Sequence, residues 1–158
     1  MSAAACAASA RVTGSGQPAR KNEGNNMNTT TEKTTAPQLP PVLVVDDDPH
    51  VLRTIEALCA SMHSPHLTLR SSTDSALEAA MDPNCGLIVC DYRFPGDSGV
   101  DFIRSVRQRG VMTPVLFISG TPDAEAVLGA AGIAHCTFIG KPFTIDRFRS
   151  AISELLGI

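Results

Sequence analysis

In the stretch VLVVDDD, residues 42–48, three aspartates directly follow four apolar residues. Three later apolar runs share this design, because each ends at or shortly before a polar residue: Leu87–Cys90 before Asp91, Val115–Ile118 before Ser119, and Phe138–Ile139 before Lys141. Short apolar runs flanked by helical patterns are typical of buried strands in a parallel sheet. Ligands of such sheets bind beyond the carboxyl ends of the strands. We therefore expect these polar side chains to meet in one small site.

Segments with strand and helix patterns alternate along residues 41–158. The expected strands are Val42–Asp46, His66–Arg70, Leu87–Asp91, Val115–Ser119 and Thr137–Ile139. Five helices are expected. The first begins at Asp48-Pro49, the second spans Thr73–Met81, the third spans Ser98–Arg109, and the fourth begins at Thr121-Pro122. The last buries an apolar stripe of Ile145, Phe148, Ile152, Leu155 and Leu156. This alternation predicts an α/β fold with a doubly wound, five-stranded parallel sheet in the flavodoxin-like order 2-1-3-4-5.

Two of these helices are expected to begin in the same way. Asp48-Pro49 and Thr121-Pro122 each combine an N-cap side chain with a proline, which suits the first turn of a helix. The helix after Thr121 is rich in alanine, and Gly129 and Gly132 weaken it, so we expect it to be short and weak.

The acids at the strand ends determine the expected chemistry. Carboxylates about 5 Å apart repel by roughly 3 kcal/mol per pair at an effective dielectric constant of about 20. Such a cluster must take up protons or hold a cation, and an all-oxygen, solvent-facing site suits Mg²⁺. One carboxylate could then attack a phosphoryl group, whose charge would be stabilised by the ammonium of Lys141 and the hydroxyl of Ser119. Because the set contains no obvious strong general base, we expect it to form and hold an aspartyl phosphate.

Taken in order, these motifs closely resemble the receiver domain of bacterial response regulators. The matching residues are VLVVDD at 42–47, DYRFPGDSG at 91–99, SG at 119–120 and KPF at 141–143. The resemblance covers residues 41–158 and implies the receiver fold. It also implies a phosphoacceptor domain of two-component signal transduction, which is not an enzyme beyond its own phosphorylation and dephosphorylation.

The resemblance also implies a role for each residue of the site. Asp91 would accept the phosphoryl group from a phosphohistidine and would also contact the Mg²⁺ cofactor. Asp47 would bind the ion directly, Asp46 mostly through water, and the backbone carbonyl of Arg93 would complete the protein ligands. Ser119 and Lys141 would then hold the phosphoryl oxygens.

Two further positions follow from the resemblance. Ser119 and Phe138 would form the switch, with the ring turning inward as the serine moves toward the phosphoryl group. An ordinary core phenylalanine is an equally good interpretation of Phe138. The bond from Lys141 to Pro142 is expected to be cis, an isomer that is largely confined to proline. Gly140 stands where the family usually has a larger residue.

A receiver requires partners. The expected phosphoryl donor is a sensor histidine kinase or a histidine phosphotransfer protein. A downstream protein would dock on the face formed by the fourth helix, fifth strand and fifth helix. Residues 1–40 are rich in Ala, Ser, Thr, Asn and Gly and are expected to form a disordered leader. We therefore expect a receiver without an output domain, with Met27 as an alternative start to Met1.

Composition argues against several other classes. A net charge of −3 without a basic stripe argues against direct nucleic-acid binding. The chain has no apolar run of membrane-spanning length and no secretory signal, so we expect a cytoplasmic location. The five cysteines are expected to be mostly buried free thiols. Three arginines are expected on a solvated helix face: Arg104, Arg107 and Arg109.

Two alternative functions fit parts of this pattern. A haloacid-dehalogenase-like phosphatase would use Asp46 as its nucleophile, but it would leave Asp91 without a role. A receiver-like interaction module that is never phosphorylated would have no need for a cluster of repelling acids.

Overall fold

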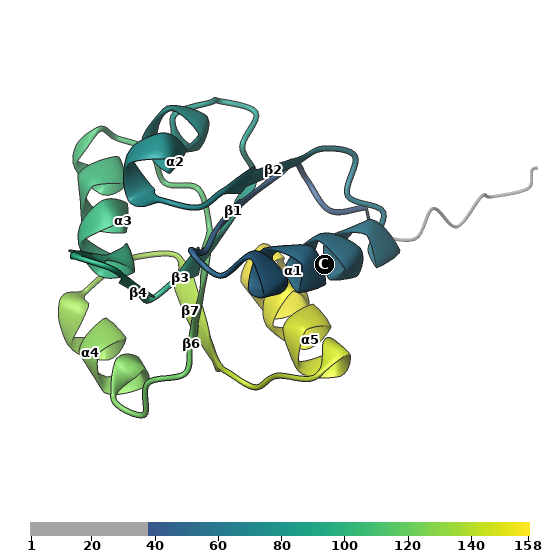
Figure 1. The fold of residues 1–158 in the computed structure, drawn as a ribbon. Helices are drawn as coiled ribbons and strands as arrows, with labels where there is room; N and C mark the ends of the chain where they lie inside the picture. The colour runs from purple at the N-terminus through teal and green to yellow at the C-terminus, as the bar shows by residue number, and fades with distance from the viewer. Residues whose placement is uncertain (1–37) are drawn as a thin grey trace, which may run out of the picture. The chain divides into compact units, whose positions relative to one another are not determined.

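A computed structural model describes residues 38–158 of the chain (Figure 1). The central sheet is parallel and consists of β1 (Val42–Val45), β2 (Leu67–Arg70), β3 (Leu87–Asp91), β6 (Val115–Ser119) and β7 (Cys136–Gly140). Its strand order is β2-β1-β3-β6-β7, which is the order predicted from the alternating pattern. The α/β class and the sheet topology are therefore confirmed. Most of the predicted leader, residues 1–37, lies outside the described residues.

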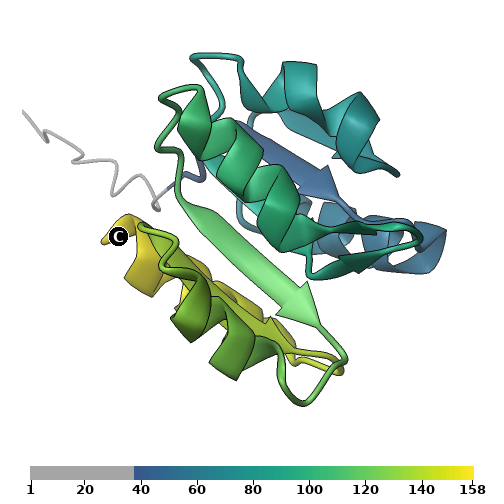
Figure 2. The same ribbon diagram turned by 90° about the vertical axis from the view of Figure 1, so that its left-hand side faces the viewer.

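Helices cover both faces of the sheet (Figures 1 and 2). One face packs against α1 (Pro49–Ser61) and α5 (Ile145–Leu156), and the other against α2 (Thr73–Ala80), α3 (Gly99–Gln108) and α4 (Ala124–Ala131). Successive strand residues point to opposite faces, and both faces are covered. This is why the central strands are apolar at every position rather than at alternate ones.

Alternation along the strands divides the core into two layers. On β1, Val42 and Val44 pack under α1 and α5, whereas Leu43 and Val45 pack under α2 and α3. The layer under α1 and α5 also includes Leu39, which is only 1% exposed. The packed part of the chain therefore begins inside the segment that the sequence assigned to the leader.

The first helix begins as predicted. The Asp48 side chain caps α1 by accepting a hydrogen bond from the His50 amide at 2.8 Å, and Pro49 occupies the first turn. The fourth helix does not follow this prediction. The N-cap residue of α4 is Asp123 rather than Thr121, so the helix begins at Ala124, and Asp123 makes no side-chain cap hydrogen bond. Instead, the Thr121 amide donates to the hydroxyl of Ser119 at 2.9 Å, which holds Thr121 in the preceding turn.

A short antiparallel hairpin follows β3 and was not predicted. It pairs β4 (Arg93–Phe94) with β5 (Asp97–Ser98) across Pro95-Gly96. Gly96 has a φ of 77°, a conformation that favours glycine at the third position of a type II turn after proline. The sequence signalled the turn, but two-residue strands are too short to show a pattern.

Two side chains differ from their predicted environment. Ile145 is 53% exposed, because it is the first residue of α5 and helical side chains point back toward the N-terminus, past the end of the helix. Arg107 is half-buried rather than solvated. Its guanidinium donates to the carbonyls of Val111, Thr113 and Ala134 and so joins the end of α3 to the starts of β6 and β7.

The cysteines are free where the structure describes them. Cys59 and Cys90 are buried, and Cys85 and Cys136 are half-buried. Burial raises the pKa of the Cys59 thiol to about 12, so this residue remains protonated and behaves as an apolar group. Within residues 38–158 no helix combines the length and the apolar character needed to cross a membrane.

Gly99 and Gly129 should respond in opposite ways to alanine. A Cβ on Gly99 would lie 2.1 Å from the Asp91 carbonyl oxygen, so we expect Gly99→Ala to cost about 3 kcal/mol, as strong overpacking does. A Cβ on Gly129, in α4, would meet nothing within 4 Å, and we expect Gly129→Ala to stabilise by about 0.5–1 kcal/mol. Urea unfolding followed by circular dichroism measures both changes. Equal effects of the two substitutions would contradict the close approach of α3 to β3.

Candidate functional site

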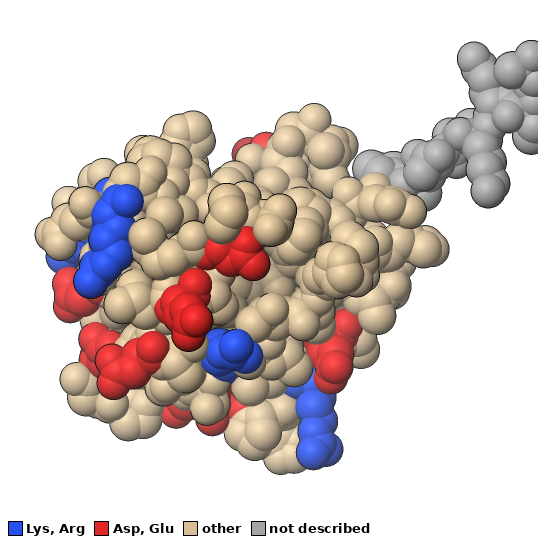
Figure 3. Space-filling model, turned by 90° about the horizontal axis from the view of Figure 1, so that it is seen from above, with Lys and Arg blue, Asp and Glu red and all other residues tan. Residues whose placement is uncertain are grey.

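The carboxyl ends of β1, β3, β6 and β7 meet at one edge of the sheet. Parallel pairing sets Val45 beside Cys90, Asp91 beside Ile118 and Ser119 beside Gly140. The polar residues that end or follow these strands therefore lie at the same edge, as predicted. Figure 3 shows one face of the molecule, where acidic side chains lie on either side of a basic one.

Three carboxylates form a cluster at this edge. Ligand oxygens of Asp46, Asp47 and Asp91 all lie within 4.8 Å of one another. Asp46 is only 1% exposed and Asp47 is exposed, whereas the Asp91 side chain is 12% exposed. Three closely spaced carboxylate oxygens, open to water through Asp47, fit the preference of Mg²⁺ for a few carboxylates with waters completing its shell.

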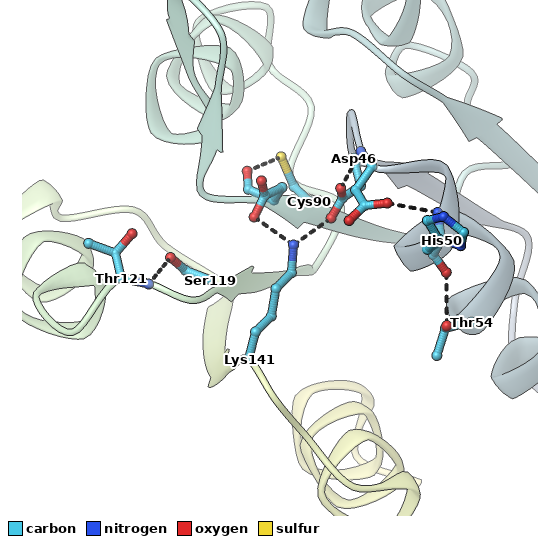
Figure 4. Close-up of polar contacts among 9 residues, drawn as sticks. Asp46, His50, Thr54, Cys90, Ser119, Thr121 and Lys141 are labelled. Carbon is cyan, nitrogen blue, oxygen red and sulfur yellow. Dashed lines mark hydrogen bonds and ion pairs between the residues drawn. The ribbon is translucent and has the colours of Figure 1, made fainter.

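Lys141 supplies the positive charge of this cluster. Its Nζ lies 2.8 Å from Asp46 Oδ2 and 3.2 Å from Asp91 Oδ1 (Figure 4). The other oxygen of Asp46 accepts a hydrogen bond from the Asp48 amide at 2.9 Å. Both oxygens of Asp46 are therefore engaged, whereas Asp91 has one oxygen on the lysine and remains accessible to solvent.

The charges in the cluster alter one another's protonation. Burial raises the pKa of Asp91, and the charge of Asp46 adds to this, while Lys141 partly opposes it. For Lys141, burial alone would lower the pKa, but the hydrogen bond and charge of Asp46, with Asp91 adding to them, raise it overall. The lysine is therefore firmly charged, and Asp91 carries a negative charge that its surroundings solvate poorly.

Ser119 lies at the neighbouring strand end. Its side chain is buried, and its hydroxyl accepts from the Thr121 amide at 2.9 Å rather than bonding to the acidic cluster (Figure 4). Its carbonyl accepts from the Lys141 amide at 2.6 Å, which joins the ends of β6 and β7. The peptide bond from Lys141 to Pro142 is cis.

The remaining predicted site residues lie further out. Arg93 is exposed on β4, two residues beyond Asp91. Phe138 is half-buried on β7 and packs on the face covered by α2 to α4. It lines a groove of about 350 Å³ against α4, together with Leu128 and Gly129. The ring therefore packs as part of this core layer and also borders open space beside α4.

Two contacts around Asp91 were missed at the sequence level. The buried thiol of Cys90 lies 3.2 Å from the Asp91 carbonyl oxygen and donates to it. The amide of Gly99 donates to the Tyr92 carbonyl at 3.0 Å, which brings α3 directly against the end of β3. The glycine after Asp97-Ser98 was a possible signal for this close approach, but Cys90 looked like any other apolar strand residue.

A family profile described as the response regulator receiver domain matches residues 42–153. The chain belongs to this family. Receiver domains are signalling domains rather than conventional enzymes, interact with histidine kinases or phosphotransfer proteins, and generally bind Mg²⁺ at an acidic cluster. The predicted family is therefore confirmed.

Curated relatives agree with this assignment. The transcriptional regulatory protein FixJ of Azorhizobium caulinodans is 31% identical over 123 residues, which are 77% of this chain and 57% of FixJ. The response regulator protein TodT of Pseudomonas putida F1 is 32% identical over 117 residues, which are 73% of this chain and 50% of TodT. The chain thus spans about half the length of these relatives.

Solved structures support the fold. The Vibrio cholerae chemotaxis protein CheY4 aligns with a TM-score of 0.66 at 20% identity, over 75% of this chain and 99% of CheY4. The receiver domain of the Francisella response regulator 1452 aligns with a TM-score of 0.65 at 24% identity, over 75% of this chain and 98% of that domain.

Replacing Asp91 by asparagine should stabilise the metal-free protein. The folded-state pKa of Asp91 is raised, so its ionised form opposes folding, and we expect Asp91→Asn to raise Tm by about 2–5 °C at pH 7. This advantage should shrink as the pH falls through the raised pKa toward the unfolded value of about 3.9. Calorimetry in EDTA measures the effect. Asp101→Asn, at an exposed position of α3, is the control, and an equal gain there would refute the explanation.

Removing the Lys141 charge should have the opposite effect. We expect Lys141→Met to cost roughly 2–3 kcal/mol, below the range for fully buried pairs because the lysine side chain is 24% exposed. Since the lysine pKa is raised, the deficit should be constant below the unfolded value of about 10.4 and should disappear as the pH rises through the folded value. Urea unfolding measures both, with Arg104→Met, which breaks an exposed pair, as the control. Similar losses in the two variants would argue against a buried pair.

Proposed function

We propose that this chain is a phosphoacceptor receiver in which Asp91 takes a phosphoryl group from a histidine kinase or histidine phosphotransfer protein, with Mg²⁺ required. The observation that carries the proposal is the placement of Lys141 between Asp46 and Asp91, within one cluster of carboxylates. Asp47, Asp91 and the backbone carbonyl of Arg93 would hold the ion directly, and Asp46 mostly through water. When bound, Mg²⁺ would neutralise the charge that develops on the phosphoryl oxygens.

Accessibility favours Asp91 over Asp46 as the nucleophile. Asp46 is buried, with one oxygen on Lys141 and the other on the Asp48 amide, so no oxygen of Asp46 is free to attack. Asp91 retains an oxygen that does not contact Lys141, and its raised pKa reflects a poorly solvated charge. This argues against the phosphatase alternative, which requires attack by Asp46.

The transfer would exchange one phosphorus bond for another. The bond between phosphorus and the donor imidazole nitrogen breaks as a bond to an Asp91 oxygen forms, and the donor histidine leaves with the electron pair. Lys141 can stay bonded to Asp46 while its remaining donors meet a phosphoryl oxygen. The hydroxyl of Ser119 is the nearest candidate for a second donor on the β6 side.

The Ser119 hydroxyl would link this reaction to the surface. It now accepts from the Thr121 amide, so turning toward a phosphoryl oxygen would break that bond and free the start of the loop before α4. α4 resists such movement weakly, because its N-cap residue makes no side-chain hydrogen bond. The groove beside Phe138 would give the ring room to follow, and the docking face of α4, β7 and α5 would change. The receiver domain proposed here is the one expected from the sequence, residues 41–158, and Leu39 just before it packs in its core.

Phosphorylation of Asp91 is testable with a small-molecule donor. After incubation with Mg²⁺ and acetyl phosphate, we expect the intact mass to rise by one phosphoryl group, with an adduct that is stable in acid and labile in base. Asp91→Asn should abolish the adduct, EDTA should prevent it, and Asp101→Asn should leave it unchanged.

The alternatives give different results in the same assay. Repeated turnover of a phosphomonoester that survives Asp91→Asn but is lost in Asp46→Asn would replace the receiver proposal by a phosphatase. Absence of an adduct both with acetyl phosphate and with a phosphorylated histidine phosphotransfer domain would leave an interaction module.

A further inference from the structure

A buried threonine outside the acidic cluster requires an explanation. Among residues 38–158, three polar side chains are buried: Asp46, Ser119 and Thr73. The first two belong to the site at the strand ends. Thr73 is 8% exposed and is the first residue of α2, the helix that follows β2.

The Thr73 hydroxyl is bonded to the hairpin that follows the phosphoacceptor. Its Oγ1 donates to Asp97 Oδ2, and Asp97 Oδ1 accepts from the Ser98 amide at 2.7 Å. The hydrogen bond from Thr73, with that from Ser98, lowers the pKa of Asp97. Asp97 is therefore a carboxylate that fixes its own strand with one oxygen and α2 with the other.

Capping of α2 does not account for this bond. Ser72 is the N-cap residue, and its side chain accepts from the Ser75 amide at 3.3 Å. The Thr73 hydroxyl is therefore not needed to satisfy the helix, and its partner lies 24 residues away in a different element.

The hairpin needs lateral support. Two-stranded hairpins are marginally stable alone, and this one has two residues in each strand. Its base is held where the Gly99 amide donates to the Tyr92 carbonyl, and Asp97, which pairs with Phe94, holds its side. Arg93 lies between these two attachments, directly after Asp91 and Tyr92.

We propose that Thr73 and Asp97 are positioning residues for the metal site, because their hydrogen bond holds the hairpin that carries the Arg93 carbonyl. This inference rests on the proposed function, which assigns that carbonyl to Mg²⁺. Neither residue belongs to the carboxylate cluster that would hold the ion. Their effect acts through the backbone of the hairpin, as outer residues commonly orient metal ligands.

Thr73→Val isolates the hydrogen bond. Valine keeps the branched shape in a buried position, and it leaves only the exposed Asp97 without its donor, so the cost in stability should be small. We expect the apparent Kd for Mg²⁺ to rise about three- to tenfold. This is no more than the smallest loss of affinity that is usual when a residue that orients a metal ligand is replaced. Thr73→Ser retains the hydroxyl and should restore affinity to within about twofold of the unsubstituted protein.

Two measurements separate positioning from general destabilisation. Tyr92 is the single tyrosine of a chain without tryptophan and adjoins Asp91, so its fluorescence reports titration of the full chain with MgCl₂. Hydrogen exchange in EDTA should show faster exchange of the hairpin amides at 93–98 in Thr73→Val. Ser72→Ala removes the α2 cap and should lower Tm without changing either measurement.

The outcomes are distinct. An unchanged Mg²⁺ affinity in Thr73→Val, or an equal loss of affinity in Ser72→Ala, would overturn the positioning role while leaving the receiver proposal intact. A Thr73→Ser variant as weak as Thr73→Val would also overturn it. If the unsubstituted protein shows neither a Mg²⁺ response nor an acetyl phosphate adduct, the proposed function fails and this inference fails with it.

Discussion

The ammonium of Lys141, shared by Asp46 and Asp91, is the interaction on which the site depends. Asp46 is almost completely removed from water, and a buried carboxylate is tolerated only when charge and hydrogen bonds compensate it. Lys141 and the Asp48 amide supply both. Because the lysine follows β7 and the acids end or follow β1 and β3, these contacts also fix the carboxyl end of the edge strand β7 relative to those of the inner strands β1 and β3. The site therefore depends on the strand order, because this order brings the carboxyl ends of β1, β3 and β7 to the same end of the sheet.

The parts of the fold that depend on patterning were predictable from the sequence. Each central strand appeared as an apolar run, because both faces of the sheet are covered, and Asp48-Pro49 marked the start of α1. Local rules failed where a tertiary contact competed with them. Thr121 looked like an N-cap, but its amide is held by the Ser119 hydroxyl. Arg107 looked solvated, although it bonds three carbonyls from two separate connecting segments.

The sequence predicted which residues converge in the candidate site better than it predicted the contacts around them. Residues at strand ends follow from the topology, so Asp46, Asp91, Ser119 and Lys141 could be placed at one edge. The bond between Thr73 and Asp97 could not be, because nothing in either local sequence indicates a partner 24 residues away. Likewise, no pattern shows that Cys90 donates to the Asp91 carbonyl. Such contacts depend on side-chain packing between elements, which periodicity does not encode.

The two ends of α4 are held very differently. Beyond its C-terminus, the Ala134 carbonyl accepts from Arg107, which also holds the chain leading into β6. Its N-terminus has no side-chain cap and adjoins the turn held by Ser119. The helix is therefore anchored near residues 132–135, whereas its N-terminal end, beside the acidic cluster, is held only weakly. If the Ser119 hydroxyl releases the Thr121 amide, the first turn of α4 should therefore move more than its last turn.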